Sequence, residues 1–216
     1  MYTLKVYKLI NMFFLFKTGG FVMWPLLICS LLSFYCAVER IIFWRNIRWH
    51  NNNTRENIIH HYLNSPSSFL DLLSNDNTYP LFSILLKALK FENCSDENFH
   101  FALSSALQSE IPSLKRHTNI FSTVITISPL LGLLGTVLGL IESFSLITIG
   151  QTGTNNIEIT GGISEALIST AAGLIVAITS LVFANYFKIE FQRELPLIKE
   201  FLVKFEIART NKSNLL

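Results

Sequence analysis

Lysine and arginine are missing from one long stretch of this sequence. None occurs between Asn119 and Phe187, although the chain of 216 residues holds 17 of them. The acidic residues of the stretch are Glu142, Glu158 and Glu165. A water-soluble domain carries charged residues over most of its surface, so this absence is typical of segments that cross a bilayer.

Metal-binding and catalytic patterns are missing too. Cys29, Cys36 and Cys94 form no CxxC pair, and the histidines have no ligand-like spacing. The sequence contains no nucleophile–base pair, phosphate-binding loop or metal signature, so we predict no catalytic residues, no metal and no enzyme. A net charge of +2 without a basic block also gives no reason to expect a nucleic-acid partner.

Long apolar runs dominate the rest of the sequence. Hydrophobic residues make up 50% of the chain, and runs of about 20 apolar residues match the ~30 Å hydrocarbon core of a bilayer. We predict an all-α membrane protein with three transmembrane helices, whose long second and third helices extend into a cytoplasmic helical domain. The transmembrane helices are placed at 19–44, 118–148 and 161–187, and a short periplasmic loop at 149–160 joins the last two.

The other segments are predicted to lie outside the bilayer. Residues 1–18 place lysines around a short apolar stretch, which favours an N-terminal amphipathic helix at the membrane interface. Residues 45–117 form the cytoplasmic helical domain, and residues 188–216 a cytoplasmic C-terminal helix and tail. Basic residues flank both segments but are absent from the 149–160 loop, so the positive-inside rule places the N-terminus in the periplasm.

Short amphipathic patterns divide residues 45–117 into helices. One helix is expected to start near Ser68, and a second to run from Pro80 to Phe91 with apolar residues at helical spacing. A third is expected to start at Ser95 and continue toward the membrane with a bend near Pro112. No strand-like alternation is sustained anywhere in the chain.

Glu39 and Arg40 lie at the predicted cytoplasmic end of the first transmembrane helix. Neighbouring helical residues point about 100° apart, so the two side chains are not expected to pair with each other. Two alternatives stay open at this stage. They anchor the helix at the interface, or they form an ion pair with a neighbouring helix or subunit.

Small residues recur in the predicted hairpin. Gly132 and Thr136, and likewise Gly135 and Gly139, have the small-xxx-small spacing that allows transmembrane helices to approach closely, and Gly173 joins this packing set in the third helix. Tight packing is the plain interpretation of these residues. Thr136 also adds a hydroxyl at membrane depth, which can bond to its own helix instead.

The third transmembrane helix carries a carboxyl group. Glu165, Ser169 and Ala172 fall on one helix face at i, i+4 and i+7, as a stripe of small and polar residues. An ionisable group in such a helix indicates a functional site, with Thr136 as its expected companion across the hairpin. The alternative is that Glu165 lies near the helix start and only favours the helix dipole.

At this point the sequence resembles the ExbB/TolQ/MotA family of proton-channel subunits, and ExbB/TolQ-type biopolymer transport subunits in particular. The resemblance is carried by SPLLGLLGTVLGLIESF at 128–144 and GGISEALISTAAGLIVAI at 161–178. GGFVMWPLL at 19–27 and ERIIFWR at 39–45 add to it. Together these motifs cover about half of the chain.

The resemblance implies an inner-membrane subunit that assembles as a homopentamer. Its second and third helices would surround a single-span ExbD/TolR-like partner with a transmembrane Asp, and a TonB- or TolA-like protein is a further expected partner. Protons are the implied coupling ion, and no other cofactor is expected. By motif position, Glu165 matches the pore glutamate of the family, and Thr136 and Thr170 match its pore threonines.

The third helix departs from the family pattern in one place and raises one geometric question. Ile178-Thr179-Ser180 stands where a proline is usual after AAGL, so a kink is not predicted there. Thr170 follows Glu165 by five residues, about 140° around an ideal helix. Ser169 is better placed by geometry, and both stay candidates for the proton pathway.

Two other functions are considered. The hairpin could serve a non-conducting oligomeric membrane scaffold, or the protein could be a MotA-like stator of a different motor. The second is less favoured, because such subunits usually have an extra transmembrane helix and a larger, more charged cytoplasmic part.

Overall fold

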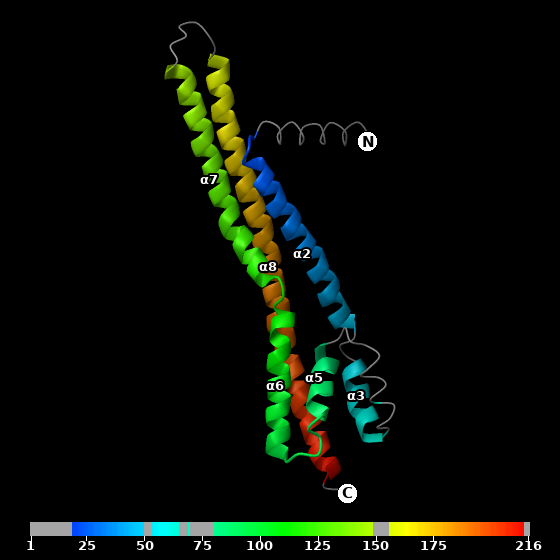
Figure 1. Cartoon of the computed structure of the whole chain (residues 1–216). Helices are drawn as coiled ribbons and strands as arrows, with labels where there is room; N and C mark the ends of the chain where they lie inside the picture. Colours follow the sequence, from blue (N-terminus) through cyan, green and yellow to red (C-terminus); the bar gives the residue numbers. More distant parts are fainter. Residues whose placement is uncertain (1–18, 50–52, 65–68, 70–79, 149–155, 214–216) are drawn as a thin grey trace, which may run out of the picture. The chain divides into compact units, whose positions relative to one another are not determined.

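The structure is a computed structural model that describes residues 19–49, 53–64, 69, 80–148 and 156–213 (Figure 1). Within these residues the regular elements are α helices, and there is no strand. The interfacial helix predicted over 1–18, the helix start near Ser68 and most of the 149–160 loop lie outside the described residues.

Six helices make up the described part of the chain. They are α2 (Met23–Trp49), α3 (Asn53–Asn64), α5 (Pro80–Leu89), α6 (Asp96–Leu114), α7 (Thr118–Thr148) and α8 (Asn156–Ser213). Three helical stretches, Met23–Arg48, Asp96–Ser145 and Thr160–Lys212, are long and apolar enough to cross a membrane. The predicted all-α class with three spanning helices is confirmed.

α8 is longer than the transmembrane helix that the sequence predicts. It begins at Asn156, five residues before the predicted start at 161, and continues through the predicted tail to Ser213. Pro196 lies inside it without ending it, although proline removes one backbone donor and commonly kinks a helix. The apolar transmembrane part and the charged tail are therefore one continuous helix.

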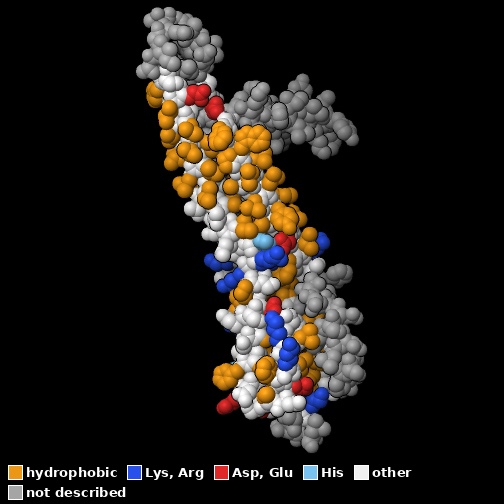
Figure 2. Space-filling view, in the orientation of Figure 1, with side chains coloured by type: hydrophobic (Ala, Val, Ile, Leu, Met, Phe, Trp, Pro, Cys, Tyr) orange, Lys and Arg blue, Asp and Glu red, His pale blue; other side chains and the backbone are white. Residues whose placement is uncertain are grey.

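The chain forms two compact units. The first comprises Met1–Ala37 and His117–Asn185, and the second comprises Val38–Arg116 and Tyr186–Leu216. Within the described residues, every lysine and arginine belongs to the second unit. Figure 2 agrees with this division, because the face that it draws is mostly hydrophobic over α7 and the first half of α8. The first unit therefore has the surface that a lipid environment requires.

Aromatic residues form the core between α3 and α8 in the second unit. The Tyr62 and Phe205 ring centroids are 4.7 Å apart, and Phe69 packs on both rings. Phe205 is completely buried. No separate helix was expected over Asn53–Asn64. The buried pair Ile58 and Tyr62, one helical turn apart, is the signal that could have found it.

α5 packs on α6 with the apolar face that the sequence predicts. Leu81, Ile84, Leu85 and Ala88 are completely buried, and so is Phe99 of α6. The helix expected from Pro80 to Phe91 is observed from Pro80 to Leu89, which confirms that prediction to within the fraying that is usual at helix ends.

Arg209 of α8 joins the tail to the turn between α5 and α6. Its guanidinium donates to the carbonyls of Glu92 (2.7 Å) and Cys94 (2.6 Å) and pairs with Asp96 at 2.6 Å. Tyr62 donates a hydrogen bond of 2.8 Å to the Glu92 carboxylate. Burial raises the pKa of Tyr62, and the bond to Glu92 raises it further, so the phenol stays a donor.

α6 continues past Pro112 and ends at Leu114, and the backbone at His117 is left-handed, with φ of 65°. The bend expected near Pro112 stays a prediction: the proline removes one backbone donor but does not end the helix. The left-handed backbone at His117 cannot continue a right-handed helix.

Glu39 and Arg40 both contact the C-terminal end of α6, and they do not pair with each other. Arg40 is buried and donates to the carbonyls of Ser113 (3.2 Å) and Leu114. The last carbonyls of a helix have no partner within it, and a cation there is favourable. Glu39 lies 3.4 Å from the Arg116 guanidinium, just after α6.

The aromatic core between α3 and α8 makes a testable prediction. Phe205→Ala should lower the free energy of unfolding by about 3–5 kcal/mol, because it removes a completely buried ring. Ile207→Ala is the matched control on the exposed side of the same helix and should change it by about 0.5 kcal/mol. Thermal unfolding in detergent measures both. Equal losses from the two variants would contradict this core.

Candidate functional site

α7 and α8 approach each other closely through glycine positions. A Cβ added at Gly132 would lie 3.0 Å from the Cα of Thr170, and one added at Gly139 would lie 2.9 Å from the carbonyl oxygen of Gly162. Likewise, a Cβ added at Gly173 would lie 3.1 Å from the Cα of Gly132. Backbone therefore lies against backbone along this contact, as small residues permit in membrane helices.

Ser169 lies inside the contact between α7 and α8. Its hydroxyl fills the space that a side chain at Gly135 would need. It donates to the carbonyl of Ala166 at 2.8 Å and lies 3.4 Å from that of Gly132. Only 1% of Ser169 is exposed. The residue that helix geometry favoured as a companion of Glu165 is therefore taken up by helix packing.

Thr170 and Thr136 both direct their hydroxyls to backbone carbonyls. Thr170 bonds across the hairpin to Gly132 at 3.0 Å, and Thr136 bonds to Leu133 of its own helix at 2.6 Å. Both residues are half-buried. Within the described residues no hydrogen bond joins Thr136 to Glu165; the Thr136 hydroxyl bonds to its own helix instead.

Glu165 is half-buried near the start of α8. Its carboxyl group lies against Gly20, just before α2. No hydrogen bond joins it to another described residue, and the negative charge of the exposed Glu142 acts on it. The hairpin thus holds a carboxylate near a second one, beside the start of the first spanning helix.

Two further hydroxyls join α2 to α8. Ser33 and Ser180 are buried and their oxygens are 2.7 Å apart. Hydrogen bonds between membrane helices contribute about 0.6 kcal/mol on average. Sequence reasoning missed this pair, because periodicity does not show which helix lies opposite Ser180. α8 continues through Ser180, so the serine supplies a contact between two helices.

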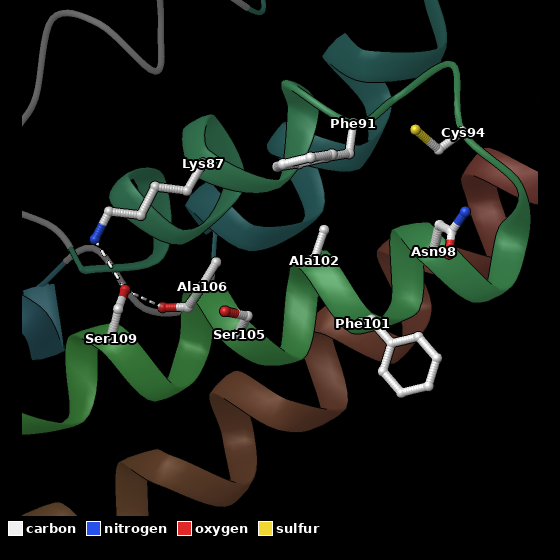
Figure 3. Close-up of a pocket in the computed structure, with 9 residues that line it drawn as sticks. All are labelled: Lys87, Phe91, Cys94, Asn98, Phe101, Ala102, Ser105, Ala106 and Ser109. Carbon is white, nitrogen blue, oxygen red and sulfur yellow. Dashed lines mark hydrogen bonds between the residues drawn. The ribbon is translucent and has the colours of Figure 1, made fainter.

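A groove in the second unit offers a different kind of site. It encloses about 580 Å³ between α5 and α6 (Figure 3). Phe91, Phe101 and Cys94 line it, with Lys87 at one end. Cys94 is exposed, whereas Cys36 is buried. The lining contains no carboxylate and no histidine.

Within the part of the chain that the structure describes, no cluster of three His, Cys, Asp or Glu side chains could hold a metal. Glu165 is the half-buried carboxyl of the described hairpin. A carboxyl group in such a setting can bind and release a proton.

Sequence comparisons decide the family. The model described as the MotA/TolQ/ExbB proton channel family matches residues 77–200, which is more than half of the chain. The ExbB-like 3 protein of Synechocystis, named as a biopolymer transport protein, is 43% identical over 191 residues, covering 88% of this chain and 91% of that protein. The chain belongs to the MotA/TolQ/ExbB family.

Two further relatives match over shorter stretches. ExbB of Salmonella typhimurium is 45% identical over 73 residues, which is 33% of this chain and 29% of that protein. TolQ of Haemophilus influenzae is 37% identical over 84 residues, covering 39% and 36%. The protein is therefore a membrane subunit of the biopolymer-transport or Tol type, in a family of transport and channel subunits that work in complexes.

The glycine contact makes a prediction for the hairpin of this family member. Gly173→Ala should lower stability by about 1–3 kcal/mol, because the added methyl meets rigid backbone of α7. Gly161→Ala is the control: nothing lies within 4 Å of its added carbon, so alanine should keep or raise stability by up to about 1 kcal/mol. Thermal unfolding in detergent measures both, and a Gly173→Ala protein as stable as the control would refute the close approach.

Proposed function

We propose that this protein is the proton-conducting subunit of an ExbB/TolQ-type inner-membrane motor. Proton flow through the complex is coupled to energised transport or to envelope maintenance. Glu165 relays the proton, and Thr136, Thr170 and Ser169 belong to the pathway or to the packing that holds it. Protons are the coupling ion, and no other cofactor takes part.

The observation that carries this proposal is the setting of Glu165. It is a carboxyl group in a stretch without lysine or arginine, and no described residue neutralises it through an ion pair. A charged group is costly in such a setting and is retained where function needs it. A carboxyl can lose and regain a proton, whereas lysine or arginine would hold a fixed positive charge in the path.

The energy available is sufficient for a motor. One elementary charge that crosses 100 mV releases about 2.3 kcal/mol. Conduction through one chain alone is not expected, because a pathway needs walls on all sides. From its family membership, we infer that the subunit works as a homopentamer around an ExbD/TolR-like single-span protein with a transmembrane Asp. A TonB- or TolA-like protein would receive the motion, and no nucleic acid is involved.

The non-conducting scaffold is the second candidate, and one observation favours it. The hydroxyls of Thr136, Ser169 and Thr170 all bond to backbone carbonyls, so packing alone accounts for them. Packing does not account for Glu165, which makes no hydrogen bond to another described residue. A MotA-like stator would use the same carboxyl, and the partner protein that purifies with the subunit distinguishes the two motors.

The role of Glu165 is tested by proton flux into vesicles that hold the reconstituted complex. Glu165→Gln should reduce the flux at least about a hundredfold, because the amide cannot release a proton. Glu142→Gln is the matched control, since it removes the exposed carboxylate of the same hairpin and should keep the flux within about threefold. Undiminished flux in Glu165→Gln would refute the assignment, and loss in both variants alike would favour a role in assembly.

The orientation is tested with the native cysteines. Cys94 is exposed, Cys36 is buried, and Cys29 is half-buried within the apolar part of α2. A membrane-impermeant maleimide should therefore react with Cys94 alone. We expect no labelling in intact spheroplasts and labelling after permeabilisation, because the second unit lies in the cytoplasm. The Cys94→Ser variant should remain unlabelled in both. Labelling of intact spheroplasts would reverse the proposed orientation.

A further inference from the structure

Gly20 lies directly against the carboxyl group of Glu165. Both residues belong to the first unit, and Gly20 precedes α2 with a φ of 70°. A Cβ added at Gly20 would collide with Oε1 of Glu165, and would lie 2.9 Å from its Cδ and 3.4 Å from its Cγ. The three heavy atoms nearest to that position thus all belong to Glu165.

We propose that Gly20 is a positioning residue for Glu165. Because residue 20 has no side chain, the carboxyl group fits beside the backbone at the start of α2, and any other residue would displace it. The consequence for proton flux rests on the proposed function, in which this carboxyl relays the proton. The steric relation between Gly20 and Glu165 does not depend on the proposed function.

Two properties of residue 20 require glycine for separate reasons. A φ of 70° is a conformation that residues with a Cβ rarely adopt. Separately, the space that a Cβ at residue 20 would need is occupied by the flexible end of the Glu165 side chain. A methyl group at residue 20 would therefore turn the carboxyl into another rotamer and leave the helices in place.

No hydrogen bond from another described residue holds the Glu165 carboxyl in its place. Its position therefore depends on the shape of its surroundings, and the space beside Gly20 is the part of them that a side chain at residue 20 would fill. Gly161 lies four residues before Glu165 on α8, yet nothing comes within 4 Å of a carbon added there. Gly161→Ala is thus a matched control with the same chemical change.

The test measures the rate at which dicyclohexylcarbodiimide labels Glu165 in the purified complex, followed by mass spectrometry. This reagent reacts with carboxyl groups in apolar surroundings and needs no proton flux. Gly20→Ala should raise the rate by about fivefold, since the carboxyl turns away from the backbone that shields it. Gly161→Ala should keep it within about twofold.

A shorter side chain separates the steric effect from backbone strain. In the Glu165→Asp variant the carboxyl carbon takes the position of the glutamate Cγ, 3.4 Å from the added carbon. That is an ordinary van der Waals distance and not a collision, so Gly20→Ala should change its labelling rate by less than about twofold in that background. An unchanged rate in the native background would overturn the proposal. An equal change in both backgrounds would also overturn it, because strain at φ of 70° would then be the cause.

Proton flux tests the functional consequence separately. Gly20→Ala should lower the flux about tenfold or more, because misplacing a reacting group by about 1 Å costs that much in catalysis, while Gly161→Ala keeps it. A labelling change without loss of flux would overturn the consequence and leave the steric relation standing. Failure of the proposed function itself appears elsewhere, as undiminished flux in the Glu165→Gln variant.

Discussion

The close contact between α7 and α8 is the constraint on which the functional unit depends. At Gly132, Gly139 and Gly173 the two helices meet backbone to backbone, with no room for a methyl group. Lipid gives helices little hydrophobic reason to associate, so van der Waals contact and hydrogen bonds between helices must hold them. The hydroxyls of Ser169 and Thr170 reach the Gly132 carbonyl only because the glycines let the helices approach. The small residues and the polar residues of this hairpin thus act together to hold the two helices in contact.

The polar groups of this unit fall into two kinds: serine hydroxyls buried between helices, and the carboxyl group of Glu165. Ser33, Ser169 and Ser180 are buried between helices and have hydrogen-bond partners, as buried polar groups must. Glu165 stands apart, half-buried and held by shape rather than by a hydrogen bond to another described residue. A group that carries a proton must not be locked in one bonded state. The hydroxyls fix the helices, and the carboxyl keeps its freedom to titrate.

The parts of the molecule that depend on local pattern could be predicted from the sequence. The absence of lysine and arginine from Asn119 to Phe187 was sufficient to predict the hairpin, and the helical spacing of apolar residues was sufficient to predict α5. α3 was missed because its stability comes from packing of Tyr62 on Phe205, residues more than 140 positions apart. The position of Gly20 beside Glu165 is equally non-local. Periodicity shows which residues share a helix face, but it does not show what lies opposite that face.

The second unit solves the opposite problem, because it must hold charged residues in fixed places. Arg40 and Arg209 are both buried, and each donates to backbone carbonyls where a helix ends or a turn leaves them unpaired. A buried cation is costly unless it gains such bonds, and the carbonyls at a helix end are costly without a donor. Each group therefore satisfies the other. Arg40 shows that residue type alone does not predict the role of an arginine at the end of a transmembrane helix. An interfacial anchor was one expectation, and its guanidinium instead caps the C-terminal end of α6.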